Sequence, residues 1–235
     1  MKRSKRNLHL WLNETYRFQE SVIHVENYLH LIKDELNQIE RELLFFKGGV
    51  LQLFNEKFYT YKIQFVEADR PKPSEHGILE GKINRENIVV YIDDQFFFYT
   101  EKENLDVFKY LVKDLCVLLS HELVHRGQYY VRQGDKLNFF NFDGNTDIVD
   151  LEYMRNPQEV MAYAYMYIES LRYSNFTNDD IIRMLKTGNF ARSQSLHISF
   201  YINEMKRASL KTYQLFRKYI YNYLVDPVRY DLKVI

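Results

Sequence analysis

The chain has 235 residues, 46% of them hydrophobic and 27% charged, which is the composition of an ordinary folded protein and excludes a disordered one. Its formal net charge is zero, so no overall field would attract nucleic acid or an anionic membrane surface. The single cysteine, Cys116, excludes an intrachain disulfide framework. No apolar run is long enough to cross a membrane and no signal peptide is recognisable, so we expect a cytoplasmic protein.

The first predicted element is a long helix, or a pair of helices, over residues 8–46. Apolar residues recur within it at spacings of three and four: Val22, Val25, Leu29, Ile32, Leu36, Ile39 and Leu43. Such a seam of about three heptads either packs on the protein's own body, which we favour, or mediates self-association or contact with a partner. Gly48 and Gly49 are expected to end the helix.

A small sheet, antiparallel or mixed, is predicted to follow. Residues 59–65 alternate apolar and polar side chains, which indicates a strand with one buried face. Two more strands are expected at 77–83 and 87–93, and residues 95–100 form a strand or lead into the next helix. That helix is long and largely apolar and runs from a cap at Asn104 to Gly134, with Cys116 inside it as a buried, unreactive thiol.

The C-terminal half is predicted to be helical. After a polar and aromatic loop at 135–156, Pro157 occupies the first position of a helix, and three more helices are expected at 177–185, 193–205 and 210–224. The fold class is therefore α+β and mostly helical. We expect a single domain, made of an N-terminal helical arm (1–47), a sheet with the central helix (48–134) and a helical lobe (135–235).

The central helix carries the pattern H-E-x-x-H at His121, Glu122 and His125. Residues four apart lie on one face of a helix, so both imidazoles can bind a single cation. Glu122 is the next residue round and can take a proton from a water on that cation, whose pKa zinc lowers towards neutrality. Polar side chains on a largely apolar helix are costly unless they are satisfied, which favours a zinc site over a chance pattern.

A catalytic zinc needs a third protein ligand. The candidates are the downstream acidic residues and one histidine: Asp143, Asp147, Asp150, Glu152, Glu159, Glu169 and His197. We favour Glu159, because it lies in the first turn of the helix after Pro157 and is therefore held more rigidly than a loop aspartate. Ala162, three residues on, would let that helix approach another closely.

With H-E-x-x-H on one helix and a glutamate on a later helix, the chain resembles the gluzincin branch of the zincin metallopeptidases, of a small soluble bacterial or phage type. The resemblance lies in "HELVH" and, more loosely, in "NPQEVMAYA". It implies a zincin-like fold, zinc ligands His121, His125 and Glu159, and Glu122 as general base and general acid. It also implies an edge strand, such as 87–93, that pairs with an extended peptide.

The second part of the motif departs from the family pattern N-E-x-x-S-D. Gln158 precedes the glutamate, and Ala162 and Tyr163 replace the serine and the aspartate that normally orients a histidine ligand. Asp147 or Asp150 could take over that orienting role. "GNTDIVD" also resembles the G-T-x-D stretch of aspzincins, which would make Asp147 the third ligand instead.

Amide hydrolysis also requires a group that stabilises the negative charge on the carbonyl oxygen. Tyr153, Tyr163, His197 and Tyr201 are candidates, and we select Tyr153 and His197.

The leading function is a zinc-dependent metallopeptidase acting on a peptide or protein substrate. The alternative is a zincin-like fold retained for binding or assembly, for example in a phage or mobile element. Nucleic-acid binding is the weakest hypothesis, since the basic residues near the C-terminus are equally explained by a solvated helix face.

Overall fold

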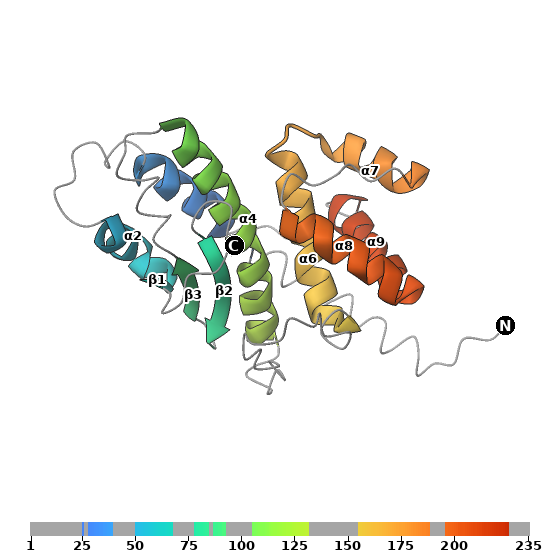
Figure 1. Ribbon diagram of the computed structural model, residues 1–235, viewed down its shortest axis with the longest axis horizontal. Helices are drawn as coiled ribbons and strands as arrows, with labels where there is room; N and C mark the ends of the chain where they lie inside the picture. The colour runs from blue at the N-terminus through green and yellow to red at the C-terminus, as the bar shows by residue number, and fades with distance from the viewer. Residues whose placement is uncertain are drawn as a thin grey trace, which may run out of the picture.

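The structure is a computed structural model. It describes residues 25, 28–39, 50–67, 78–84, 87–92, 105–131, 155–188 and 196–225. In these residues the chain is mostly helical and contains one small sheet. Helix α4 (Leu105–Val131) runs through the middle, with helix α2 (Val50–Phe58) and the sheet on one side and helix α6 (Pro157–Arg172) on the other (Figure 1). The predicted α+β, mostly helical class is confirmed, whereas the boundaries of the predicted segments 1–47, 48–134 and 135–235 stay a prediction.

The N-terminal seam packs within the chain itself. Its described members are all buried: Val25, Leu29, Ile32, Leu36 and Ile39. On the same helical segment, 28–39, the ammonium of Lys33 lies 2.8 Å from the carboxylate of Glu169 on α6. Packing on the protein's own body is therefore confirmed for this part of the seam. Val22, Leu43 and the two glycines lie outside the described residues, and self-association stays a prediction.

The strand predicted at 59–65 begins four residues later than expected. Residues Tyr59–Tyr61 form a short 3-10 helix, η1, and Lys62 adopts a left-handed conformation (φ 55) in which its N–H donates to the Tyr59 carbonyl. Only then does strand β1 (Ile63–Glu67) start. The alternating pattern failed because Tyr59 is 80% exposed instead of facing the core. Helix α2, which precedes this turn, was not predicted.

The sheet has the strand order β1–β3–β2, with β2 spanning Ile78–Asn84 and β3 spanning Asn87–Ile92. β1 runs parallel to β3 and β2 runs antiparallel to it, so the sheet is mixed and a wholly antiparallel one is wrong. The choice of 87–93 as an edge strand is also wrong, because β3 pairs on both sides. β2 contacts α4 and lies beside it in Figure 1.

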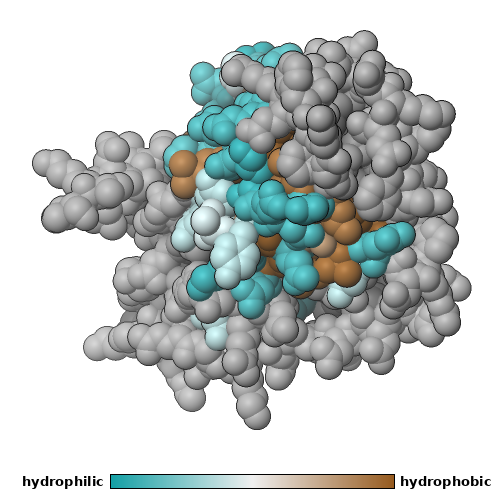
Figure 2. Space-filling view, turned by 90° about the vertical axis from the view of Figure 1, so that its left-hand side faces the viewer, coloured by the Kyte–Doolittle hydropathy of each residue, from teal (hydrophilic) through white to brown (hydrophobic). Residues whose placement is uncertain are grey.

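Buried polar contacts join α4 to the N-terminal part of the chain. Arg126, only 2% exposed, donates to the Tyr61 carbonyl of η1, and its guanidinium lies 4.6 Å from the centre of the Tyr28 ring. Figure 2 shows the outer face on the α2 side, where hydrophilic residues cover most of the described surface and hydrophobic areas are smaller.

The helical lobe follows the predicted order. Asn156 caps α6 by accepting from Gln158 N–H, with Pro157 in the first turn as expected. Thr177 caps α7 (Asn178–Thr187) in a reciprocal capping box with Asp180. Helices α8 (Leu196–Ala208) and α9 (Leu210–Val225) complete the lobe. None of the described helices combines the length and the hydropathy that a membrane span requires.

Candidate metal centre

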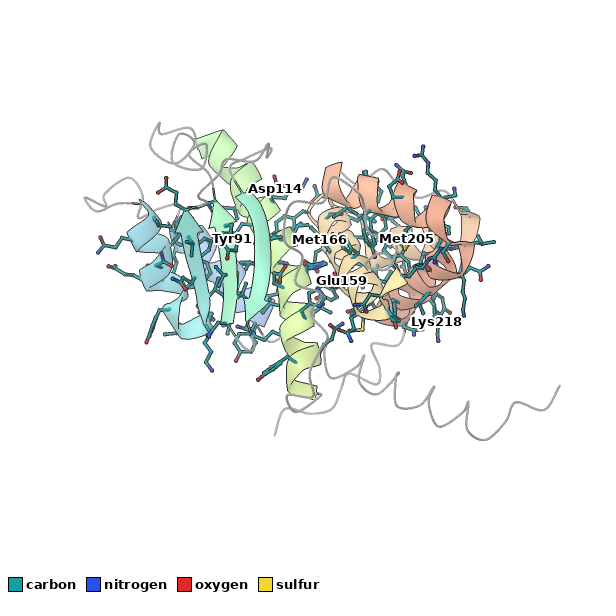
Figure 3. All side chains as sticks on the ribbon, turned by 60° about the horizontal axis from the view of Figure 1, so that its bottom comes forward. Tyr91, Asp114, Glu159, Met166, Met205 and Lys218 are labelled. Carbon is teal, nitrogen blue, oxygen red and sulfur yellow. The ribbon has the colours of Figure 1, made fainter. Side chains whose placement is uncertain are left out.

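Three side chains from two helices converge between α4 and α6. His121 and His125 come from α4, and Glu159 comes from the first turn of α6. Their ligand atoms lie within 4.8 Å of one another, and they form the group that could hold a metal ion among the described residues. Figure 3 shows the labelled Glu159 in the space between the two helices. Among the described candidates, Glu159, the ligand preferred on sequence grounds, therefore lies close to both imidazoles.

The local sequence explains why these groups meet. The four-residue spacing places both imidazoles on the face of α4 that packs on α6. The Asn156 cap and Pro157 fix the start of α6, so Glu159 lies in its first turn, where the helix dipole favours a carboxylate. Ala162 is fully buried and allows the two helices to pack closely, as predicted.

The ligand atoms lie close enough together for one small cation to contact both imidazoles and the carboxylate. The two imidazole Nε2 atoms are 3.0 Å apart, and the Glu159 oxygens lie 3.5 Å from His121 Nε2 and 3.3 Å from His125 Nε2. Bonds of about 2.0–2.1 Å around a tetrahedral zinc would separate its ligand atoms by roughly 3.3–3.4 Å. Oε2 of Glu159 is buried and has no hydrogen-bond partner among the described residues, so it remains available as a ligand.

In the absence of a metal, the surroundings of the centre favour a protonated His125. Burial disfavours a charged imidazole at His125, but the carboxylate of Glu159, together with Glu122 and the contact with Gln128, outweighs it and raises the pKa of His125 from 6.5 to about 9. Burial would likewise raise the pKa of Glu159, but the neighbouring His125 and His121 hold it far below its ordinary value of 4.5. The charges of this group therefore favour a positive species among the three side chains, which either a proton on His125 or a metal ion supplies.

His125 is oriented by a residue that sequence reasoning missed. Its Nδ1 lies 2.9 Å from Oε1 of Gln128, and the Gln128 amide nitrogen donates to the Gln158 carbonyl at 3.2 Å. A glutamine oxygen can only accept, so with this assignment Nδ1 carries the proton and Nε2 presents its lone pair. The signal available in the sequence was the spacing of three residues between His125 and Gln128 on one helix.

His121 has different surroundings. Its ring meets the ring of Tyr163 edge-on, with centroids 4.6 Å apart, and Tyr163 stacks on Tyr201 of α8 at 3.5 Å. Nδ1 of His121 has no hydrogen-bond partner within the described part of the chain. Burial, followed by the neighbouring Tyr163 and Glu159, raises the pKa of the Tyr201 hydroxyl far above 10.0. Both tyrosines were among the considered candidates for charge stabilisation, but neither was selected.

The other predicted site residues fall in three classes. Glu122 is 5% exposed, and its charge contributes to the raised pKa of His125, so it belongs to the surroundings of the centre. Glu169 does not, because it pairs with Lys33 and Arg172. His197 is within α8, but its side chain is not described. The remaining candidates lie outside the described residues: Asp143, Asp147, Asp150, Glu152 and Tyr153.

Comparisons with protein-family models, with curated proteins and with solved structures find no match to this chain. A likeness to known zincins is therefore not shown. The case for the centre rests on the residue types, the distances and the burial described above.

Proposed function

We propose that this chain is a zinc-dependent metallopeptidase, with His121, His125 and Glu159 as zinc ligands and Glu122 as general base. The observation that carries the proposal is the convergence of the three ligand atoms from α4 and α6 within 4.8 Å of one another. The buried Glu122 adjoining this group supports hydrolysis, because a site that only binds a metal has no chemical need for a carboxylate there.

Zinc suits this set of donors better than Mg²⁺ or Ca²⁺ does. Mg²⁺ and Ca²⁺ prefer oxygen ligands, whereas two imidazoles and a carboxylate are a known catalytic zinc set. Each imidazole Nε2 lies 3.3–3.5 Å from one oxygen of Glu159, near the separation of two ligand atoms around a tetrahedral zinc. Three protein ligands also leave a fourth position for water or substrate, as a catalytic site requires and a closed structural site does not.

A zinc ion held by His121, His125 and Glu159 would make a bound water more acidic and would polarise the substrate carbonyl. The carboxylate of Glu122 accepts a proton from the water that attacks the peptide carbonyl carbon. The protonated Glu122 then donates that proton to the leaving amine as the C–N bond breaks, so the carboxylate is regenerated. Gln128 accepts a hydrogen bond from Nδ1 of His125 and so leaves Nε2 without a proton and free to bind the metal. The stabilising roles of Tyr153 and His197 at the carbonyl oxygen stay predictions.

The sheet offers a place for an extended substrate. Among the described strands, β1 and β2 are each paired on one side only, by β3, and β2 is the edge strand that packs on α4. We propose that β2, in place of the strand originally expected at 87–93, aligns a peptide by backbone hydrogen bonds. Main-chain pairing would accept many sequences, so specificity would depend on pockets on either side of the strand.

The test begins with metal content and two glutamates of α6. The untagged protein should contain about one zinc per chain by mass spectrometry of the metal. Glu159→Gln should lose the zinc, while the matched control Glu169→Gln should keep it, because Glu169 is buried on the same helix but pairs with Lys33 and Arg172. Asp147→Ala should also keep it. Zinc lost from Asp147→Ala but retained by Glu159→Gln would refute the ligand assignment.

Hydrolysis is tested separately, with a mixture of peptides of diverse sequence and product detection by mass spectrometry. The wild type should cleave some of them, lose activity with a chelator and regain it with added zinc. Glu122→Gln should retain zinc and lose cleavage. If the fully zinc-loaded wild type cleaves no peptide, the peptidase is refuted and a retained binding or assembly role takes its place.

A further inference from the structure

We propose that the aromatic ring of Tyr163 positions His121 for metal binding, and that it does so by ring packing in place of a hydrogen-bonded carboxylate. The inference rests on the metal centre of the proposed function but not on its peptidase activity. A tyrosine ring does not accept a hydrogen bond from an imidazole N–H as a carboxylate does, so any hold that it has on His121 comes from packing.

The His121 ring is held against two other rings. Tyr163 contacts it at a centroid distance of 4.6 Å and an interplanar angle of 71°, and His125 contacts it at 4.7 Å and 79°. Both are edge-to-face arrangements, the geometry that aromatic pairs prefer. Turning the His121 ring about its bond to Cβ would disrupt both contacts. The packing therefore fixes the direction of Nε2, which is the atom that faces Glu159.

Tyr163 is itself held in place by α8. Its ring stacks on Tyr201, with centroids 3.5 Å apart and planes 10° apart, and Tyr201 is only 3% exposed. The rings of His121, Tyr163 and Tyr201 thus contact one another in series and connect α4, α6 and α8. Tyr163 also lies four residues after Glu159, so one face of α6 supplies both a ligand and the support of another ligand.

The two histidines are consequently oriented by different forces. His125 has the polar partner Gln128 at 2.9 Å, whereas Nδ1 of His121 has no hydrogen-bond partner among the residues that the structure describes. If the ring of Tyr163 does the positioning, its hydroxyl is dispensable. Tyr163→Phe should then bind zinc as the wild type does, while Tyr163→Leu should bind it roughly 10–100-fold more weakly, the usual effect of losing a group that orients a ligand.

The experiment measures zinc affinity by competition with a chromophoric chelator, and the visible spectrum of the Co²⁺-loaded protein as a report on ligand geometry. The control is Tyr165→Leu. Tyr165 is a buried tyrosine on the same helix whose ring packs on Tyr223 of α9 instead, at 4.8 Å. Tyr165→Leu should lower the unfolding temperature but leave zinc affinity and the Co²⁺ spectrum unchanged. Tyr163→Leu should weaken affinity and alter the spectrum.

Tyr201→Leu provides a second variant in case Tyr163→Leu does not fold. It removes the stacked support but keeps the contact with His121, so it should weaken zinc binding less than Tyr163→Leu. Wild-type affinity in both leucine variants would overturn the proposal. An equal loss in Tyr163→Phe and Tyr163→Leu would also overturn it, because the hydroxyl would then be the essential group. A wild type that binds zinc without cleaving peptides refutes only the peptidase, and one that binds no zinc refutes the metal centre and this inference together.

Discussion

Nδ1 of His125 and Oε1 of Gln128 lie 2.9 Å apart, one turn from each other on the same helix. This contact selects the tautomer of His125 whose Nε2 can bind a metal, and the Gln128 amide joins it to the Gln158 carbonyl on α6. A residue that binds no metal itself therefore links the helix of the two histidines to the helix of the glutamate.

Replacing Gln128 should weaken metal binding without removing a ligand. We expect Gln128→Leu to lower zinc affinity roughly 10–100-fold, because His125 loses the acceptor that fixes its proton on Nδ1. Gln158→Ala is the matched control, since it keeps the main-chain carbonyl to which Gln128 donates. Competition with a chelator gives both affinities. Equal affinities for Gln128→Leu and the wild type would show that the contact does not orient His125.

The metal-free protein should lose stability at alkaline pH. The pKa of His125 is raised from 6.5 to about 9, so protonation favours the folded state. That contribution is complete below about pH 6.5 and disappears as the pH rises through about 9. The lowered pKa of Glu159 adds a contribution that is present above its ordinary value of 4.5 and lost as the pH falls further.

Denaturant unfolding in the presence of a chelator, at a series of pH values from 6 to 10, measures how the free energy of unfolding changes with pH. It therefore tests the contribution of the His125–Glu159 pair. Glu159→Gln removes the charge that raises the pKa of His125, so its stability should fall less steeply over the same range. Identical profiles for the variant and the wild type would contradict the assigned coupling.

Cys116 should not react with thiol reagents in the folded protein. It is fully buried, and burial raises the pKa of its thiol to about 12, so almost no thiolate exists at neutral pH. We expect no alkylation by iodoacetamide at pH 8 under native conditions and full alkylation in denaturant, read by intact mass. Rapid native labelling would show that α4 opens or that the side chain is accessible.

The N-terminal seam should contribute strongly to stability. Ile32 is fully buried and its neighbour Leu31 is 39% exposed on the same helix. Ile32→Ala should therefore reduce the free energy of unfolding by about 2–5 kcal/mol, as truncations in a packed core do. Leu31→Ala, the control, should cost far less. Similar small effects for both substitutions would place the seam outside the folding core.

Local sequence patterns correctly predicted those features of the structure that depend on residues close together in the chain. Four-residue helical spacing put His121 and His125 on one face, and Pro157 marked the start of the helix that carries Glu159. Burial of Cys116 and of the N-terminal seam followed from helical periodicity in the same way. These features depend on neighbours in the sequence, so the sequence alone could predict them.

Features that depend on distant contacts could not be predicted. The alternation at 59–65 suggested a strand, but packing of Phe54 and Phe58 on Phe65 favours a helix and a left-handed turn first. The central place of β3 follows from pairing on both sides, which no local pattern encodes.

The sequence by itself therefore determined the two histidines, the adjoining Glu122 and the helical frame that holds them. It also ranked Glu159 first among the acidic candidates, but only the packing of α4 on α6 decided that this carboxylate lies 3.3–3.5 Å from both imidazoles. The tertiary structure alone revealed that Gln128 holds one histidine and that the Tyr163–Tyr201 stack contacts the other. The physical reason is that ligand atoms 34 or more residues apart in the chain meet through the shape and volume of packed side chains, which sequence spacing does not specify.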